Sequence, residues 1–221
     1  MTVSIPRFEP VTDVRPDDQP WDEMVWPVPA GTELQGSTVT LSLLDPARDS
    51  EELFHALDRD EVWAHVPLRP TNPAHFEEIL SARVGLADWT PWVVRTSAGV
   101  VGTSSYLDVS PHDARIEIGF TVYSPDVWGS AVNPETKLLL LGYAFDTLRA
   151  GRVQLKTDTR NKRSQQAIAR LGAQYEGTLR RHFRRADGSV RDTVMFSVIA
   201  EDWPTVRDGL RERVELVGAN R

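Results

Sequence analysis

The chain has 221 residues and a formal net charge of -7, and it contains no cysteine. This length suffices for one domain with a sizeable core, or for one domain with an extension. Without cysteine the chain has no disulfide, no cysteine-based zinc site and no thiol nucleophile. The acidic balance argues against a nucleic-acid partner, because phosphate binding requires concentrated lysine and arginine. No apolar run reaches membrane length and no secretory signal pattern is present, so we expect a cytoplasmic protein with no membrane partner.

Residues 1–35 differ in composition from the rest of the chain. The prolines of this segment are Pro6, Pro10, Pro16, Pro20, Pro27 and Pro29. They are mixed with acidic residues, so regular secondary structure is not expected there. Trp21, Val25 and Trp26 are too apolar for a solvated tail, and we expect them to lie against the domain or against a second copy in a homodimer. The sequence therefore predicts a proline-rich extension over residues 1–35 and one domain over residues 36–221.

The first half of the domain predicts one strand, two helices and three further strands. Their predicted ranges are residues 38–44, 47–57, 73–84, 92–95, 100–109 and 115–123. In the first strand Val39, Leu41 and Leu43 alternate with polar or smaller residues. The second helix starts at Asn72-Pro73, an N-cap followed by a proline in the first helical position.

The second half predicts a helix, a strand, a helix, a hairpin and a last helix. Their predicted ranges are residues 134–148, 153–157, 161–172, 174–183 with 190–199, and 203–214. A turn at Asp187-Gly188 joins the two strands of the hairpin. Gly151 and Gly172 end the two helices that precede them.

The turn before the helix at Pro134 has the composition of an anion-binding site. Gly129 and Ala131 allow the backbone to approach an anion closely. Asn133 is a good N-cap, and Pro134 fits the first helical position. The free N–H groups and the positive end of the helix dipole would then face the turn, which favours binding of a pyrophosphate.

A second motif lies downstream, where Asn161 and Ser164 open a helix that ends at Leu171-Gly172. Together with the turn at Asp126–Ala131 and the segment at 176–180, it resembles the GCN5-related N-acetyltransferase superfamily. The branch of ribosomal-protein alanine and serine N-acetyltransferases is the most similar, and the resemblance covers about residues 37–203. It implies an α/β (α+β) fold of the acyl-CoA N-acyltransferase type, a mixed, mostly antiparallel twisted sheet with helices on both faces. Asp126 departs from the family loop, which has Gln or Arg at that position.

The resemblance also implies which residues hold the cofactor, acetyl-CoA or another acyl-CoA. Phe120, Thr121 and Val122 would line the pantetheine arm. The pyrophosphate and neighbouring groups would contact Trp128, Gly129, Ser130, Ala131, Val132, Asn133, Thr136, Asn161, Arg163 and Ser164. A plain strand and turn would need no ligand, and Asn161 is also a common helix N-cap, so a structural role stays open for these residues.

Acyl transfer to an amine requires a base, a polarised carbonyl and a protonated leaving thiolate. Many relatives protonate the thiolate with a Tyr, but Ile168 occupies that position, so the resemblance implies Ser164 instead. A backbone N–H near Val122 would polarise the carbonyl. The position of a carboxylate found in some relatives is Phe183, which leaves two candidates for the base, His182 and Glu117.

His182 has a suitable intrinsic pKa, and we expect the nearby arginines 180, 181 and 184 to keep its ring neutral. Strand alternation would place the side chains of Arg181 and Phe183 on one face of the strand and those of Arg180, His182 and Arg184 on the other face. Glu117, with Asp108 behind it, could act through a water. The histidines show no metal-ligand spacing, so no metal is expected.

The resulting hypothesis is an N-acyltransferase that moves an acetyl group from acetyl-CoA directly to a primary amine of a protein N-terminus or a small molecule. No covalent enzyme intermediate is expected. Two alternatives stay open. The first is a succinyl-CoA-type donor, whose carboxylate the arginines near residue 180 could bind. The second is a non-catalytic acyl-CoA-binding module. A Rossmann or P-loop protein does not fit, because the turn lacks the later glycine and any Gly-Lys-Ser/Thr sequence.

Overall fold

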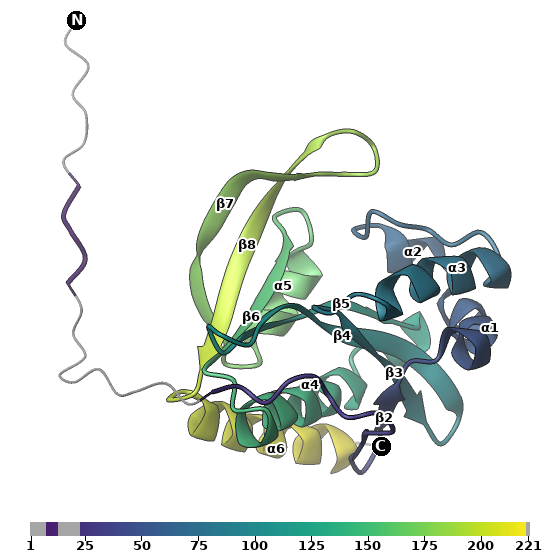
Figure 1. Ribbon diagram of the computed structural model, residues 1–221, viewed down its shortest axis with the longest axis horizontal. Coiled ribbons are helices and arrows are strands. Elements are labelled where there is room, and N and C mark those ends of the chain that lie inside the picture. Colours follow the sequence, from purple (N-terminus) through teal and green to yellow (C-terminus); the bar gives the residue numbers. More distant parts are fainter. Residues whose placement is uncertain (1–7, 13–22, 220–221) are drawn as a thin grey trace, which may run out of the picture.

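The computed structural model describes residues 8–12 and 23–219, and they form an eight-stranded sheet with helices on both faces (Figure 1). The strands are β1 (Glu33–Gln35), β2 (Thr40–Leu43), β3 (Thr90–Thr96), β4 (Gly99–Ser110), β5 (Arg115–Tyr123), β6 (Arg152–Asp158), β7 (Gln174–Arg184) and β8 (Val190–Ile199). The helices are α1 (Pro46–Leu57), α2 (Asp60–Trp63), α3 (Pro73–Val84), α4 (Val132–Gly142), α5 (Lys162–Ala169) and α6 (Trp203–Ala219). A short 3-10 turn, η1 (Pro125–Val127), precedes α4, and a π-helical turn, η2 (Tyr143–Thr147), follows it.

The strand order is β1-β2-β3-β4-β5-β6-β8-β7. Each neighbouring pair in the described sheet is antiparallel except β5 with β6, which run parallel. A parallel neighbour requires a crossover, and α4 provides it between the two strands. The predicted mixed, mostly antiparallel sheet with helices on both faces is confirmed.

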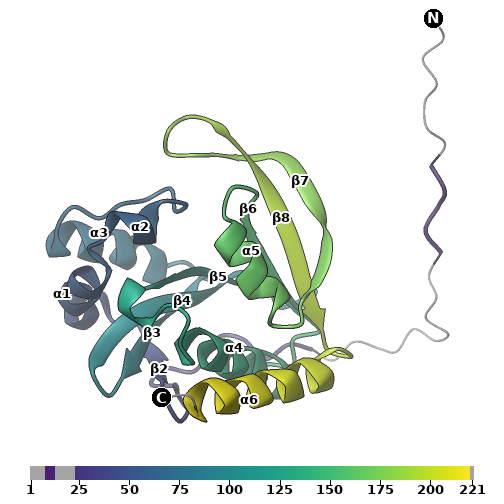
Figure 2. The ribbon, with the colours of Figure 1, turned by 180° about the vertical axis from the view of Figure 1, so that it is seen from behind.

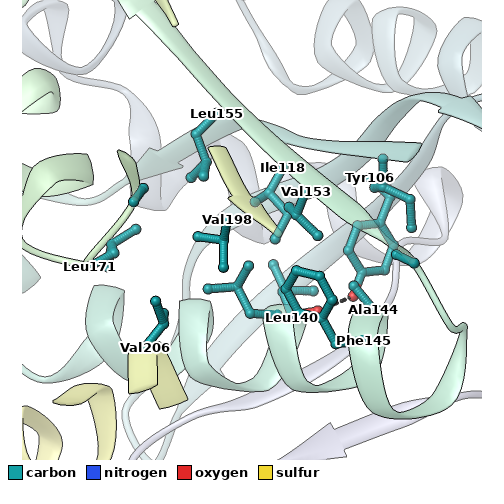
Figure 3. Close-up of a cluster of buried hydrophobic side chains, with 14 of the residues drawn as sticks. Tyr106, Ile118, Leu140, Ala144, Phe145, Val153, Leu155, Leu171, Val198 and Val206 are labelled. Carbon is teal, nitrogen blue, oxygen red and sulfur yellow. Dashed lines mark hydrogen bonds between the residues drawn. The ribbon is translucent and has the colours of Figure 1, made fainter. Parts of the chain in front are cut away.

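The sheet separates two apolar cores. Helices α1 and α3 bury Leu53 and Phe76 against Val93 and Val122 on the side that we call the α1–α3 face. On the opposite side, the α4–α6 face, α4 and α6 pack together against the strands (Figure 2). In Figure 3, Leu140 and Phe145 point from the helical segment toward Tyr106 of β4, whose hydroxyl donates to the Leu140 carbonyl at 2.5 Å. Each face of the sheet therefore has its own hydrophobic support.

Asx caps fix the starts of the predicted helices on the α1–α3 face. Asp45 accepts from the Ala47 amide before α1, and Asn72 accepts from the His75 amide before α3. Pro46 and Pro73 occupy the first helical positions, where the missing N–H costs nothing. The predicted Asn-Pro start of α3 is confirmed.

The start of α4 differs from the expectation. The helix begins at Val132, with Ala131 in the N-cap position, so the prediction that Asn133 caps it and Pro134 begins it was wrong. The physical reason is Ser130, whose hydroxyl accepts the Val132 amide at 3.2 Å and satisfies a donor of the first turn. The helix also ends earlier than the predicted Leu148, because the chain continues from Tyr143 as the π-helical turn.

The N-terminal segment from Met24 packs on the domain. Met24 and Val28 are buried in the core of the α4–α6 face, and the Trp26 indole donates to the Ala87 carbonyl at 3.1 Å. The side chain of Val25 is 47% exposed, whereas its amide donates to the Leu148 carbonyl. Trp21 lies outside the described residues. The domain boundary at residue 35 stays a prediction, although β1 already begins at Glu33.

Within the part of the chain that the structure describes, no helix is both long and apolar enough to cross a membrane. The same residues contain no group of three or more His, Asp or Glu side chains arranged to hold a metal ion.

Candidate active site

Strands β5 and β6 pair only over their first residues. The register runs Arg115 to Arg152, Ile116 to Val153 and Glu117 to Gln154, and it ends there. Beyond this point β5 stays paired with β4 and β6 stays paired with β8. The two strands therefore separate after Glu117, and both lead at the same edge of the sheet into segments that the sequence assigns to cofactor binding.

The turn after β5 offers a set of unused backbone donors. Gly129 has a φ of 77°, a left-handed conformation that favours glycine. The amides of Gly129, Ala131 and Asn133 have no hydrogen-bond partner among the described residues, whereas Ser130 donates to the Val127 carbonyl. These donors lie at the N-terminus of α4, where the helix dipole is positive. The residues present therefore fit a pyrophosphate.

Two predicted side chains meet across the edge where the strands separate. The guanidinium of Arg163, from α5, lies over the Trp128 ring at 3.5 Å from its centroid, and burial lowers the pKa of Arg163. The Trp128 indole donates to the Tyr123 carbonyl at 3.1 Å. The turn and α5 are thus in contact at the outer end of the separated strands.

The start of α5 follows the prediction. Asn161 is its N-cap, and the side-chain oxygen accepts from the Ser164 amide at 3.0 Å. Among the described residues the Ser164 hydroxyl has no hydrogen-bond partner, and the residue is partly exposed. The side chain of Asn161 is committed to the cap, while the Ser164 hydroxyl is free for another contact.

A bulge interrupts β5 at the predicted pantetheine residues. Val122 pairs with Thr103 and Gly119 pairs with Ser105, so Ser104 faces both Phe120 and Thr121. Phe120 has a φ of 45°, which a non-glycine residue rarely adopts. The bulge turns Phe120 toward the α1–α3 face, where it packs beside that core.

A buried lysine supports the bulge from the α4–α6 face. Lys137 of α4 is 4% exposed, and its ammonium donates to Thr121 at 2.8 Å and to Ser104 at 3.0 Å. The two hydroxyls are 2.7 Å apart, so the three groups form one network. Burial lowers the pKa of Lys137 to about 7.

A buried carboxylate lies where β5 and β6 separate. Glu117 is 2% exposed and faces away from the neighbouring core residues Ile116 and Ile118. Its Oε2 accepts from the Lys156 ammonium at 2.6 Å and from Gln154 at 3.2 Å. Gln154 also donates to Asp108 at 2.9 Å, which places Asp108 behind Glu117 as predicted. Burial raises the pKa of Glu117, although Lys156 and Gln154 act in the opposite direction.

The other carboxylate oxygen of Glu117 has no hydrogen-bond partner among the described residues. It lies along β5 beside Gly119, since a Cβ at that glycine would approach Oε1 to 2.7 Å. Gly119 is followed by the bulge at Phe120. The free oxygen therefore lies next to the bulge, between Glu117 and Phe120.

His182, the other candidate base, lies on the exposed strand β7. Burial, Lys156 and Arg191 lower its pKa, in that order. The direction agrees with the expected neutral ring, but the expected cause was wrong, because the neighbouring arginines 180, 181 and 184 are not among the causes. Those arginines are exposed, and the structure does not gather them at Glu117.

The alternation predicted along this strand was also wrong. Leu179 pairs with Thr193 and Phe183 pairs with Arg191, so β7 contains a bulge between them. Arg181 has a φ of 53° within it. Phe183 and His182 are therefore both near Lys156: the ammonium lies 5.4 Å from the Phe183 ring centroid, and the centroids of the two rings are 4.0 Å apart.

Several predicted cofactor residues have buried side chains. Ser130, Ala131 and Val132 are between 1% and 9% exposed, so only their backbones are suited to a ligand contact. Thr136 is fully buried inside α4, and its role stays a prediction. A groove of about 790 Å³ flanks the turn at Asp126 and Val127, but the β1–β2 turn and the β3–β4 turn, with the strand ends beside them, form most of its lining. We place the site at the separated strands, because Glu117 and Phe120 lie there and not in that groove.

Sequence reasoning missed Lys156, Gln154 and Lys137. For the first two a signal was present, because Gln154 and Lys156 alternate with the apolar Val153 and Leu155 along one strand. The polar side of β6 therefore faces away from the α4–α6 core and lies beside Glu117. No comparable signal identified Lys137, since a lysine in a helix is normally exposed.

The parallel strands β5 and β6 separate beside a turn whose free amides fit an anion. The chain with this architecture belongs to the acetyltransferase (GNAT) family, whose domain model matches residues 38–174. The uncharacterized N-acetyltransferase p20 of Bacillus licheniformis is 28% identical over 111 residues, which cover 50% of this chain and 61% of that protein. The chain thus matches less than two thirds of that relative's length.

Solved structures share the whole architecture. A GCN5-related N-acetyltransferase from Brucella melitensis is 26% identical, with a TM-score of 0.79 over 85% of this chain and 87% of that one. Mycobacterium smegmatis RimJ in complex with CoA-disulfide is 19% identical, with a TM-score of 0.70 over 79% and 88% of the two chains. The ribosomal-protein-S5-alanine acetyltransferase from Vibrio fischeri is 18% identical, with a TM-score of 0.66 over 78% and 98%. At the last two identities the likeness shows the fold alone.

Proposed function

We propose that this protein transfers the acetyl group of acetyl-CoA directly to a primary amine, and that Glu117 is the base. One observation carries the proposal: the buried Glu117 carboxylate keeps one oxygen free beside the bulge at Phe120, where β5 and β6 separate. Burial raises the pKa of Glu117, which suits a base that works near neutral pH. Lys156 keeps the carboxylate oriented through its ion pair at 2.6 Å.

In the proposed reaction, the amine nitrogen attacks the thioester carbonyl, the C–N bond forms and the C–S bond breaks. The free Glu117 oxygen takes the proton that the amine loses, directly or through one water. The bulge at Phe120 and Thr121 positions the backbone N–H that polarises the carbonyl. The leaving sulfur takes its proton from the Ser164 hydroxyl, which regains one from solvent.

Acceptor, assembly and location belong to the same proposal. The acceptor is a primary amine of a protein N-terminus or of a small molecule. We further propose a homodimer that works in the cytoplasm, where CoA thioesters are available.

Release of free CoA thiol tests the activity. The wild-type protein is incubated with acetyl-CoA or succinyl-CoA and a panel of amines that includes peptides with alanine or serine at the N-terminus. We expect amine-dependent release with acetyl-CoA above the rate of hydrolysis. If no amine increases the release of CoA thiol from either acetyl-CoA or succinyl-CoA, the proposed function is contradicted.

The cofactor turn is tested separately by Gly129→Glu. A carboxylate at this position would repel the pyrophosphate and strain a residue with φ of 77°, so calorimetry should show a loss of CoA affinity of 100-fold or more, on the order of 3 kcal/mol. Gly31→Glu is a matched control, because Gly31 has the same φ and equally open surroundings. Unchanged CoA affinity in a folded Gly129→Glu protein would remove the turn from the site.

Ser164→Ala tests the proton donor for the leaving thiolate. Turnover should fall by about 10²-fold, whereas the affinity for acetyl-CoA should stay close to that of the wild type. Stopped-flow measurement of thiol release and calorimetry separate the two quantities. Wild-type turnover would leave Ser164 as a residue of the helix only.

A further inference from the structure

An arginine without a counter-ion lies on the α1–α3 face, beside the bulge of β5. Arg83, in the last turn of α3, stacks over Trp89 and Phe120, with its Cζ 4.9 and 5.2 Å from the two ring centroids. The rings themselves meet edge to face at 5.7 Å. The two aromatic side chains therefore hold the planar guanidinium in one place.

The polar groups of this cluster lack partners. Among the described residues Arg83 has no ion pair and no side-chain hydrogen bond, and its Nε is buried unpaired. The indole N–H of Trp89 is likewise buried without a partner. Burial lowers the pKa of Arg83, because nothing nearby compensates its charge. Folded proteins seldom leave buried donors unused, so two such donors side by side indicate a missing acceptor.

Most other partly buried arginines among the described residues are paired with a carboxylate. Arg95 meets Asp49 at 2.6 Å, Arg152 meets Glu176 at 2.5 Å and Arg185 meets Asp158 at 2.6 Å. Arg191 and Arg213 have no carboxylate either, but they donate to the Thr193 hydroxyl and the Arg170 carbonyl, whereas the partly buried Arg83 has neither kind of partner among the described residues. The difference indicates that its carboxylate comes from outside the chain.

The location connects Arg83 with the proposed chemistry. Phe120 forms the bulge, and Gly119 next to it borders the free oxygen of Glu117. An anion bound to Arg83 would thus lie beside the reacting amine and carbonyl. A carboxylate suits the site best, because a guanidinium binds it through two parallel hydrogen bonds.

We propose that Arg83, held by Trp89 and Phe120, binds a carboxylate of the substrate, and that the acceptor is an amine which carries this carboxylate. The inference rests on the proposed function and narrows its acceptor class. A dicarboxylic acyl chain on CoA would offer the same chemistry from the donor side, so the experiment separates the two sources.

The experiment compares matched substrates in matched variants. Each amino acid of a panel is paired with its own carboxamide, which keeps the primary amine and removes the negative charge. The ratio of kcat/KM for acid over amide is measured in the wild type, Arg83→Met, Arg83→Lys and Arg211→Met, an exposed arginine of α6 that serves as control. Comparison between variants cancels the different basicity of the two amines. Succinyl-CoA against acetyl-CoA gives the corresponding ratio for the donor.

We expect Arg83→Met to lower the acid-over-amide ratio by about 10- to 100-fold, Arg83→Lys to lower it less, and Arg211→Met to leave it unchanged. A fall confined to the succinyl-over-acetyl ratio would support the anion site and assign the carboxylate to the acyl chain. If neither ratio changes in Arg83→Met, the proposal is wrong and the stack is only structural.

Calorimetry with N-acetyl amino acids and their amides, in the presence of CoA, provides a readout that needs no turnover. A preference for the acid that Arg83→Met abolishes would support the site even if no amine releases CoA, which would overturn the proposed function alone. Equal binding of acid and amide to the wild type, or a preference that Arg83→Met leaves intact, would overturn the inference. CoA affinity measured on each variant confirms that it is folded.

Discussion

The two faces of β5 both bury an ionisable side chain, but the surroundings of the two side chains differ. On the α1–α3 face Glu117 is paired with Lys156 at 2.6 Å, and one of its oxygens stays free. On the α4–α6 face Lys137 has no carboxylate among the described residues and contacts only the hydroxyls of Ser104 and Thr121. Both groups lie within a few residues of the bulge at Phe120.

The difference separates a reactive group from a supporting one. A carboxylate with one oriented and one free oxygen can accept a proton without losing its place. A lysine whose hydrogen bonds go to two hydroxyls of adjacent strands fixes the backbone between them, and its burial without a counter-ion costs stability. We therefore expect substitutions on the α1–α3 face of β5 to change turnover, and substitutions on its α4–α6 face to change stability.

The largest effect is expected from Glu117→Gln. The amide keeps the shape and can still contact Lys156, but it cannot accept a proton, so kcat should fall by about 10²- to 10⁴-fold with CoA affinity retained. Because burial raises the pKa of Glu117, wild-type kcat/KM should decline at acid pH as this carboxylate becomes protonated, and the variant should lose that limb. Steady-state rates from pH 5 to pH 9 check both statements.

His182→Ala is the contrasting variant for this prediction. If its profile keeps the acid limb, the limb belongs to Glu117. If the limb disappears in His182→Ala and remains in Glu117→Gln, the base is His182, and the α1–α3 face of β5 is not the reactive one.

A smaller effect on the same face is expected from Gly119→Ala. The added Cβ would lie 2.7 Å from Oε1 of Glu117 and 3.1 Å from a methyl of Leu107, so it must displace the free oxygen. We expect a loss in kcat of about 10-fold, since a misplaced general base loses part of its contribution, with little change in CoA affinity. Gly209→Ala in α6 is the control, because nothing lies within 4 Å of its added Cβ. Wild-type turnover in Gly119→Ala would mean that the Oε1 position is unimportant.

The sequence predicted most secondary-structure elements, but not every helix boundary. Apolar alternation and Asx-Pro caps determine strands β2 to β8 and α3 locally, so those elements were predicted to within a few residues, whereas β1 lies in the segment where no regular structure was expected. The start of α4 was missed because the Ser130 hydroxyl competes with Asn133 as the cap.

At the site, Ser164 and the turn at Gly129 were predicted from motifs and Glu117 from its place on the strand before the turn, and their roles stay predictions. Lys156 and Arg83 required tertiary information, because their meaning depends on which strand or ring lies beside them. The bulge in β7 shows the same limit, since alternation along a strand cannot reveal where a register shifts.

The last prediction concerns the second face, where Lys137→Met should change stability with pH. Burial lowers the pKa of Lys137 to about 7 in the folded protein, whereas an unfolded lysine titrates near 10.4. Between these values the unfolded chain holds the proton and the folded protein does not, so this group makes wild-type stability rise as pH rises from about 7 to 10. Met fills a similar volume and does not titrate, and Ser104 and Thr121 can still bond each other. The free energy of unfolding of Lys137→Met, relative to the wild type, should therefore be highest at pH 6 to 7 and should fall steadily toward pH 10.

Urea unfolding at several pH values measures this difference in the free energy of unfolding, with the exposed Lys162→Met as control. If the difference in unfolding free energy between Lys137→Met and the wild type stays constant with pH, Lys137 remains charged in the folded protein. The α4–α6 face would then stabilise a buried charge, as the α1–α3 face does for Glu117.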